Sequence, residues 1–357
     1  MEFTYILSFA IVLIISFLLT PIVAKVSSDL YIVAWPGERH IHKKITPRMG
    51  GLAIYTAFLV GCAIFVRGDQ QIMAILLGGF VIGTCGVLDD LTELKATTKL
   101  FFQIVATLIV VFYGQIRIEH INIPGGFTID FGILATIITI LWIVGITNAV
   151  NLIDGMDGLC AGVSSIILAT FAMISYMQGR VDIVLLSIIL LAAIIGFLFH
   201  NFYPASIFMG DTGSLFIGYM IATISLLGFK SSAFLTLGPA IFILAIPILD
   251  TFLSIIRRKV KGKAIMAPDK EHLHHTLMYK LNLSQTKTVL IIYMITFYFS
   301  QVSYAYILDK KVAFYMLIVA FIVIELFIEK TSMISKKYRP ILKVVDSIRV
   351  LFKRRQH

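Results

Sequence analysis

Four polar side chains recur at every third position within a short stretch of the chain, residues 147–158, which lies between two long apolar runs. They are Asn148, Asn151, Asp154 and Asp157. On a helical turn, residues three apart share roughly one face. Carboxylates and amides among apolar segments destabilise a protein unless a cation or a polar substrate uses them. The spacing therefore predicts a binding or catalytic site.

Further acids stand at the ends of two other apolar runs. Asp89 and Asp90 follow one run directly, where adjacent carboxylates repel and the negative end of a helix dipole disfavours both. A bound divalent cation or a lysine, Lys95 or Lys99, would relieve these penalties. Asp211 lies in a Gly-Asp-Thr-Gly-Ser turn before another run, where it either caps the helix or binds a metal beside phosphate.

An acid inside a later apolar run, Asp250, either marks a functional site or pairs with a nearby cation. The next loop carries His272, His274 and His275. The other polar loops offer carboxylates and no thiolates, which favours a hard cation such as Mg²⁺, with Mn²⁺ as a substitute, over zinc. We therefore expect the histidines to contact a phosphate or a base.

A cationic segment precedes a Thr-Pro-Arg-Met-Gly-Gly turn at residues 46–51. It either touches anionic lipid headgroups or holds phosphate, since arginine and lysine pair well with phosphate oxygens. Its side chains are Arg39, His40, His42, Lys43, Lys44 and Arg48. Carboxylates for a cation combined with basic side chains for phosphates indicate phosphoryl transfer.

Membrane helices must position these residues, because the chain is too apolar for an ordinary soluble protein. Its 357 residues are 59% hydrophobic and only 14% charged, with a mean hydropathy of +0.94. Apolar windows long enough to cross a bilayer recur about eleven times. They lie at about 3–24, 49–66, 72–88, 98–113, 131–147, 159–177, 182–199, 213–229, 233–256, 288–307 and 312–329.

The sequence thus predicts an all-α polytopic membrane protein with about eleven transmembrane helices. Residues 1–335 form a single transmembrane catalytic domain, and residues 336–357 form a basic tail on the inner leaflet. The alternation of apolar and polar residues around Pro-Gly-Gly predicts a small extracytoplasmic β-hairpin near 116–131. Cys62, Cys85 and Cys160 are expected to be buried small hydrophobes.

The distribution of basic residues predicts the orientation. Of the 30 lysines and arginines, 24 lie in the odd-numbered connections and the tail, and 6 lie in the even-numbered connections. The positive-inside rule then places the N-terminus outside, and the C-terminus and all the polar clusters in the cytoplasm. This asymmetry accounts for most of the net charge of +10, so no nucleic-acid partner is needed to explain it.

Five motifs in order resemble the polyprenyl-phosphate N-acetylhexosamine-1-phosphate transferase family over nearly the whole chain. They are Thr46-Pro-Arg-Met-Gly-Gly51, Leu88-Asp-Asp90, Asn148-x-x-Asn-x-x-Asp-Gly-x-Asp-Gly158, Met209-Gly-Asp-x-Gly-Ser214 and Pro268-Asp-x-x-His-x-His-His275. The resemblance implies a bacterial enzyme of the cell membrane. It would move a sugar 1-phosphate from a uridine diphosphate sugar onto undecaprenyl phosphate, with release of UMP and a need for Mg²⁺.

The resemblance also implies roles for individual residues. The implied catalytic acids are Asp89, Asp90, Asp154 and Asp157, with Asp89 deprotonating or orienting the lipid phosphate. The implied metal ligands are Asp211 and Asp154. The implied substrate-binding side chains are Arg48, Lys99, Asn148, Asn151, His272, His274 and His275. We favour direct attack of the lipid phosphate on the β-phosphorus over a covalent intermediate on Asp154, and the sequence leaves both open.

The branch of the family is indicated by finer features. Arg48, the spaced His-Leu-His-His segment and an eleventh span with a basic tail resemble the branch that uses UDP-N-acetylglucosamine, above all the initiators of wall teichoic acid synthesis. Members of this branch also start O-antigen or common-antigen chains. The alternatives are a phospho-N-acetylmuramoyl-pentapeptide transferase of the same family or, in a different class, an ion-coupled secondary transporter. A homodimer stays open.

Overall fold

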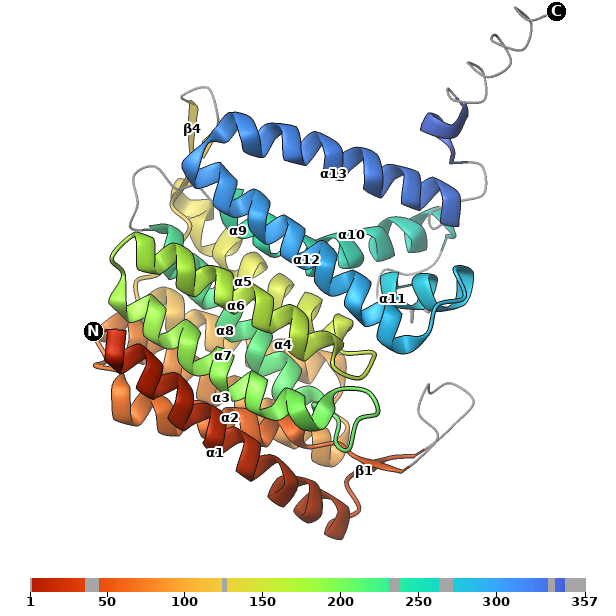
Figure 1. Ribbon diagram of the computed structural model, residues 1–357. Helices are drawn as coiled ribbons and strands as arrows, with labels where there is room; N and C mark the ends of the chain where they lie inside the picture. Colours follow the sequence, from red (N-terminus) through yellow and green to blue (C-terminus); the bar gives the residue numbers. More distant parts are fainter. Residues whose placement is uncertain are drawn as a thin grey trace, which may run out of the picture.

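Helices running side by side make up almost the whole of the computed structural model (Figure 1). The structure describes residues 2–35, 45–123, 127–230, 238–262, 272–332 and 338–343. Most of the predicted cationic segment, the Pro268–Asp269 part of the histidine motif and most of the basic tail lie outside these residues.

Thirteen α-helices follow one another along the described chain, and they leave room for only two very small sheets. The α-helices are α1 (Glu2–Asp29), α2 (Gly50–Phe65), α3 (Gln70–Thr92), α4 (Ala96–Leu108), α5 (Ala135–Ile153), α6 (Leu159–Met177), α7 (Val181–Asn201), α8 (Gly210–Lys230), α9 (Gly238–Ile243), α10 (Ala245–Val260), α11 (Leu273–His275), α12 (Gln285–Leu308) and α13 (Lys310–Thr331). Short irregular helices are η1 (Ile109–Tyr113), η2 (Gly132–Leu134) and η3 (Thr276–Lys280).

The prediction of an all-α polytopic membrane protein is confirmed. Among the described residues, nine helices are long and apolar enough to cross a membrane. The two remaining predicted spans correspond to shorter helices. One is α2, with 16 residues. The other is divided at Leu244 into α9 and α10. The last turn of α10 carries Arg257, Arg258 and Lys259.

Local signals in the sequence start several of these helices. The Asp69 carboxylate accepts a hydrogen bond from the backbone N–H of Ile72 and so caps α3. Ser284 caps α12, and Asp309 caps α13, in the same way. Polar caps at these points satisfy backbone groups that would otherwise be left without partners at the helix ends.

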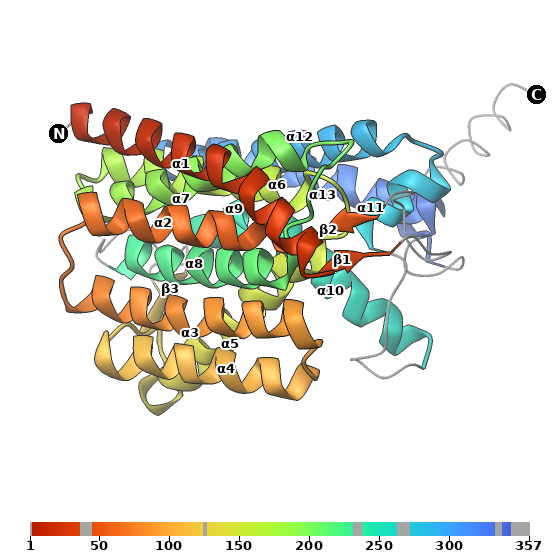
Figure 2. The same cartoon turned by 90° about the horizontal axis from the view of Figure 1, so that it is seen from below.

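Helix α8 lies at the centre of the bundle, packed against α2, α3, α5 and α6 (Figure 2). Nearly all of its apolar length is buried. Small residues such as Gly213, Ser214 and Gly218 line it, and small residues let neighbouring helix backbones approach closely in a membrane. The first residues of α8 are therefore surrounded by the ends of other helices.

The two sheets lie at opposite ends of the bundle (Figures 1 and 2). Strands β3 (His120–Ile123) and β4 (Phe127–Asp130) pair antiparallel, which confirms the predicted hairpin. Strands β1 (Val33–Ala34) and β2 (Thr46–Pro47) pair at the other end, next to the end of α1. The second sheet holds the chain just before Arg48 in place.

Candidate active site

The predicted acids come together where α3 ends and α8 begins. Asp90 is 7% exposed, and its carboxylate accepts three hydrogen bonds from the first residues of α8. The donors are the backbone N–H of Asp211 at 2.9 Å, the backbone N–H of Thr212 at 3.0 Å and the Thr212 hydroxyl at 2.6 Å. The positive end of the α8 dipole therefore stabilises an acid that stands unfavourably at the end of its own helix.

Lys99 of α4 joins the two remaining acids of this cluster. Its Nζ lies 3.2 Å from Asp89 Oδ2 and 2.7 Å from Asp211 Oδ2. Asp89 is further fixed through its other oxygen, which accepts a hydrogen bond from the backbone N–H of Leu94 at 2.8 Å. Of the two lysines expected to offset Asp89 and Asp90, the structure thus brings Lys99 to the site, where it also holds Asp211.

Arg48 reaches the same cluster from the turn before α2. Its Nε lies 3.6 Å from Asp90 Oδ1, and its Nη2 lies 3.8 Å from Asp211 Oδ1. About a third of the Arg48 side chain stays exposed. A partly exposed guanidinium beside a buried acid cluster can still donate to a phosphate oxygen.

The two asparagines of the central stretch have different surroundings. Asn151 Nδ2 donates to Ser214 Oγ at 2.8 Å and to Asp211 Oδ1 at 3.3 Å, so it belongs to the acid cluster. Asn148 lies one turn earlier in α5, where its amide pairs with Gln103 of α4 at 2.8 and 3.3 Å. A substrate contact by Asn148 stays a prediction.

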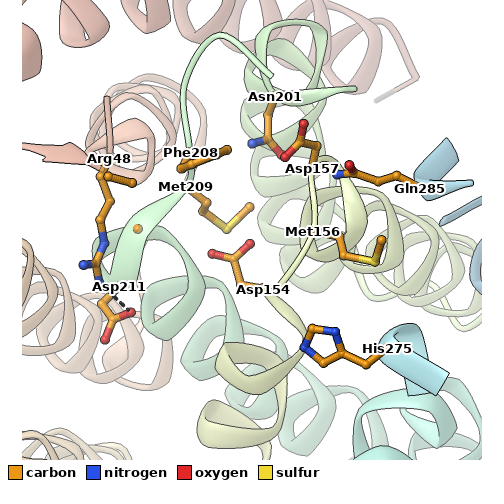
Figure 3. Close-up of a pocket in the computed structure, with 13 residues that line it drawn as sticks. Arg48, Asp154, Met156, Asp157, Asn201, Phe208, Met209, Asp211, His275 and Gln285 are labelled. Carbon is orange, nitrogen blue, oxygen red and sulfur yellow. Dashed lines mark ion pairs between the residues drawn. The ribbon is translucent and has the colours of Figure 1, made fainter. Parts of the chain in front are cut away.

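A cavity of about 380 Å³ opens beside this cluster (Figure 3). Residues of several elements line it: Ala34, Arg48, Asp154, Gly155, Met156, Asp157, Asn201, Phe208, Met209, Gly210, Asp211, His275 and Gln285. Arg48 and Asp211 form one side, Gln285 and His275 form another, and the Asp154 carboxylate points into the space between them. Polar and charged groups with a few apolar surfaces are typical of a site for a polar ligand.

Asp154 differs from the other acids because its carboxylate forms no hydrogen bond or ion pair with any part of the chain that the structure describes. Burial of the carboxylate, together with the negative charges of Asp211 and Asp90, raises the pKa of Asp154 to about 8. The negative charges that raise this pKa also attract a cation to the carboxylate.

Asp157 holds the loop that presents Asp154. Its Oδ2 accepts a hydrogen bond from the backbone N–H of Ala205 at 3.0 Å. Asn201 accepts one from the backbone N–H of Gly158 at 3.0 Å, and the Tyr293 hydroxyl donates to the Gly158 carbonyl. The loop is therefore fixed from α7 and from α12, and Asp157 still lines the cavity.

The histidine segment is anchored by Asp250, which is 2% exposed. Asp250 Oδ2 lies 2.9 Å from His272 Nδ1, and Asp250 Oδ1 accepts from the backbone N–H of Leu273 at 2.7 Å. Of the two interpretations of Asp250, this geometry matches a structural pair, here with an imidazole and a backbone N–H. The contact places His274 and His275 beside the loop 154–158.

The three histidines have three different positions. His272 is bound to Asp250, His274 is buried, and His275 lines the cavity. Burial and the nearby charge of His275 lower the pKa of His274 to about 3, so its imidazole is neutral. A β-carbon on Gly155 would lie only 2.6 Å from His274 Nε2, and this approach needs a glycine.

The donor set suits a hard cation that takes part of its coordination from a substrate. Asp154 and Asp211 both line the cavity with carboxylate oxygens, which are ligands that Mg²⁺ prefers. Within the described ranges, no three His, Cys, Asp or Glu side chains form a cluster that could hold a metal. Mg²⁺ often binds through one or two carboxylates plus phosphates and water, so these two acids fit it.

The structure adds side chains that the sequence did not single out. Asn201 stands in the polar turn just before the Asp211 motif, and Gln103 is an amide four residues after Lys99 inside an apolar run. These two positions carried a signal, since a polar side chain in such a place needs a partner. Phe208 and Gln285 line the cavity without any such signal in their neighbourhood.

The backbones of α2 and α8 touch beside the acid cluster. A β-carbon on Gly51 would lie 2.0 Å from the backbone nitrogen of Gly213 and 2.3 Å from its Cα. The backbone N–H groups of Gly50 and Gly51 also donate to the carbonyls of Phe208 and Met209, at 2.9 and 2.7 Å. Main-chain contacts thus fix the turn that carries Arg48 against the turn that carries Asp211.

Known proteins are similar to this chain over most of its length. The model of glycosyl transferase family 4 matches residues 72–229. A Bacillus subtilis protein named probable undecaprenyl-phosphate N-acetylglucosaminyl 1-phosphate transferase is 41% identical over 344 residues, which cover 95% of each chain.

Two further relatives are more distant. A decaprenyl-phosphate N-acetylglucosaminephosphotransferase of Mycobacterium tuberculosis is 36% identical over 79% of this chain and 77% of its own length. A phospho-N-acetylmuramoyl-pentapeptide-transferase of Bacillus velezensis is 32% identical over 77% of this chain and 89% of its own. The names of all three describe the transfer of a phosphosugar, two of them onto a polyprenyl phosphate.

Proposed function

The chain belongs to glycosyl transferase family 4, the polyprenyl-phosphate N-acetylhexosamine-1-phosphate transferases, and on this premise we propose that its donor is UDP-N-acetylglucosamine and its acceptor undecaprenyl phosphate. The products would be undecaprenyl-diphosphate-N-acetylglucosamine and UMP. The observation that carries this choice is the 41% identity, over 95% of both chains, with the Bacillus subtilis relative.

The arrangement of charges supports a reaction between two phosphates. The attacking oxygen belongs to the lipid phosphate, and the bond that breaks joins the β-phosphorus of the donor to the oxygen bridging it to the α-phosphate. Both reactants are anions, so their approach needs positive charge. Lys99 and Arg48 supply it at the acid cluster, and Arg48 lies on the cavity wall.

Each acid then has a proposed task. Asp89, held by Lys99, orients the lipid phosphate or takes its proton. Asp154 points into the cavity. This position suits a direct reaction that Asp154 assists, and it equally suits a reaction through a covalent aspartyl intermediate. We favour the direct reaction, because Lys99 and Asp89 already provide a place for the acceptor phosphate. His275 and Arg48, on different sides of the cavity, would hold the donor diphosphate.

Asp211 and Asp154 would hold Mg²⁺, which would neutralise phosphate charge during transfer. Asp211 is presented by the first turn of α8, with Lys99 and Asn151 bound to its carboxylate. These contacts set its direction before any cation arrives. An Asp211→Asn variant should fold in membranes and lose turnover, and full activity of that variant would contradict its role as a ligand.

We place the site on the cytoplasmic side of a bacterial cell membrane, with the N-terminus outside. Most lysines and arginines lie in the loops near the site and in the basic tail, and the positive-inside rule then favours this orientation. Nucleotide sugars are cytosolic, so the donor would enter from that side and the lipid acceptor from the bilayer. We further propose that the product starts a cell-surface polymer, wall teichoic acid in preference to O-antigen or common antigen.

A radiolabel transfer assay in membranes tests the proposal. Undecaprenyl phosphate and Mg²⁺ would be supplied with either labelled UDP-N-acetylglucosamine or labelled UDP-N-acetylmuramoyl-pentapeptide. Label that enters lipid only from the first donor, with UMP released, is the expected result. Transfer only from the second would support the function in the name of the Bacillus velezensis relative. No transfer from either donor by folded protein would contradict the proposed donor. Omission of Mg²⁺ tests the cofactor in the same assay.

A further inference from the structure

Two amides, the buried Gln103 and the half-buried Asn148, connect α4 and α5 one helical turn away from the acid cluster. Gln103 Nε2 donates to Asn148 Oδ1 at 3.3 Å, and Asn148 Nδ2 donates to Gln103 Oε1 at 2.8 Å. Asn148 Nδ2 also donates to the Val144 carbonyl at 2.8 Å. A reciprocal pair of this kind fixes both the rotation and the axial position of one helix relative to the other, because each donor needs its own acceptor.

The position of this pair relates directly to the site. Lys99 lies four residues before Gln103 in α4, and Asn151 lies three residues after Asn148 in α5, so each shares a helix face with a member of the pair. Lys99 and Asn151 both bind Asp211, through different oxygens. The amide pair and Asp211 are therefore two successive connections between the same two helices.

Helix α4 buries few of its own side chains. It lies at the edge of the bundle (Figure 2), where it packs against α3 and α5. Its buried residues are Gln103, Ala106 and Thr107, and Gln103 is the largest of them at 2% exposed. The largest buried side chain of α4 is thus a polar one, although an apolar side chain would pack there at less desolvation cost.

We propose that Gln103 is a positioning residue. Through Asn148 it sets α4 against α5, so that the Lys99 ammonium group stays within reach of Asp89 and Asp211 at once. The proposal rests on the proposed phosphoryl transfer, in which Lys99 helps to hold the acceptor phosphate. Small displacements of such a group are costly, since catalysis depends on geometry held to a fraction of an ångström.

The amide pair offers a test by exchange. Gln103→Asn shortens one arm of the pair, and Asn148→Gln lengthens the other. Each single variant should lower kcat per folded molecule about tenfold, because Lys99 is displaced. The double variant Gln103→Asn with Asn148→Gln restores the combined length and should recover kcat to within about threefold of wild type. The pH dependence of kcat should shift in the single variants and return in the double.

Two controls separate positioning from stability and from the function itself. Thr107→Val removes another buried polar group of α4. Among the described residues, its hydroxyl bonds within its own helix, to the Gln103 carbonyl, so this variant should keep wild-type kcat. Acetylation of Lys99 by an amine-specific reagent, followed by mass spectrometry, reports the exposure of Lys99 without any turnover. It should be faster in both single variants and return to the wild-type rate in the double.

The outcomes are distinct. The proposal would be overturned if the single variants had a lowered Tm but wild-type kcat, pH profile and Lys99 acetylation rate. It would also be overturned if the double variant were not rescued. If wild-type protein transfers no sugar phosphate, the proposed function fails. The acetylation rates then decide the positioning role by themselves, with rescue in the double variant supporting it and unchanged rates overturning it.

Discussion

Asp90 and Asp154 are both aspartates at helix ends beside the same cavity, yet they have opposite surroundings. Asp90 accepts three hydrogen bonds from the start of α8 and lies near Arg48. Asp154 points into the cavity, with its pKa raised to about 8 by burial and by nearby carboxylates. Asp90 is thus engaged by several protein donors, whereas the Asp154 carboxylate has no hydrogen-bond partner in the described part of the chain and faces the cavity.

This difference shows how a membrane enzyme can keep several acids together. Lys99, Arg48 and the α8 N-terminus offset the negative charges of Asp89, Asp90 and Asp211. Together these groups form the frame of the site. Asp154 is placed by a loop that other residues hold rigid. Variants should therefore divide into those that damage the frame and those that damage only the reaction.

The largest effect is expected from Asp154→Asn. The amide keeps the shape of the side chain, but it binds a cation more weakly than a carboxylate does and cannot act as a nucleophile. Turnover should fall by about 10³-fold or more, while the Tm of the purified protein stays at the wild-type value, because no described contact of the fold uses this carboxylate. Transfer assays and thermal unfolding in detergent measure both. A Tm drop as large as that of the next variant would remove the distinction between the two acids.

Asp90→Asn should damage the frame itself. The new amide NH₂ would face the N–H groups of Asp211 and Thr212, so at least one buried donor loses its acceptor. We expect a destabilisation of about 3 kcal/mol together with loss of activity. Thr212→Val, which removes only the hydroxyl donor at 2.6 Å, should lie between this variant and wild type. Unchanged Tm in Asp90→Asn would show that its bonds are dispensable.

Gly51→Ala tests the frame through the main chain. The added methyl group would meet backbone atoms of Gly213 at 2.0 and 2.3 Å, and backbone cannot move aside as a side chain does. Overpacking of this kind should cost about 1–3 kcal/mol and reduce turnover by separating Arg48 from Asp211. The matched control is Gly145→Ala in α5, which has open space around it and should leave Tm equal or slightly raised. Equal behaviour of the two variants would contradict the contact.

The smallest effect concerns pH and the histidine segment. The pKa of His274 is about 3 in the fold and about 6.5 in an unfolded chain, so the unfolded state takes up the proton first as the pH falls. Stability is then complete above pH 6.5 and declines as the pH falls from 6.5 toward 3. At pH 5 the loss is about 2 kcal/mol. Tm should fall between pH 7.5 and 5, and it should fall less in His274→Asn. An equal fall in both proteins would exclude His274 as the cause.

Much of this architecture could be predicted from the sequence because membrane helices leave a strong signal. Long apolar windows gave the helical class, and the alternation around Pro-Gly-Gly gave the hairpin at β3 and β4. The ends of those windows also located the acids, since a charged residue in an apolar run is expensive and seldom accidental. These features depend on residues close together in the chain.

The partners of the acids could not be predicted, because they depend on how the helices are rotated and packed. Lys99 is 112 positions from Asp211, and Gln103 is 45 positions from Asn148. The spacing predicts that Asn148 and Asn151 share one helix face. In the packed structure, however, Asn148 hydrogen-bonds to Gln103 of α4 and Asn151 to Asp211. Similarly, hydropathy joined α9 and α10 into one span, whereas the chain divides them at Leu244.

The close contact between Gly51 and Gly213 also bears on how this protein can change over time. Exposed positions of α1 and α13, such as Ile6 or Val319, can exchange one apolar side chain for another at little cost. At the glycine contact no larger residue is tolerated without moving the main chain. New variants can therefore accumulate on the lipid-facing surface while the distance between the arginine turn and the aspartate turn is inherited unchanged.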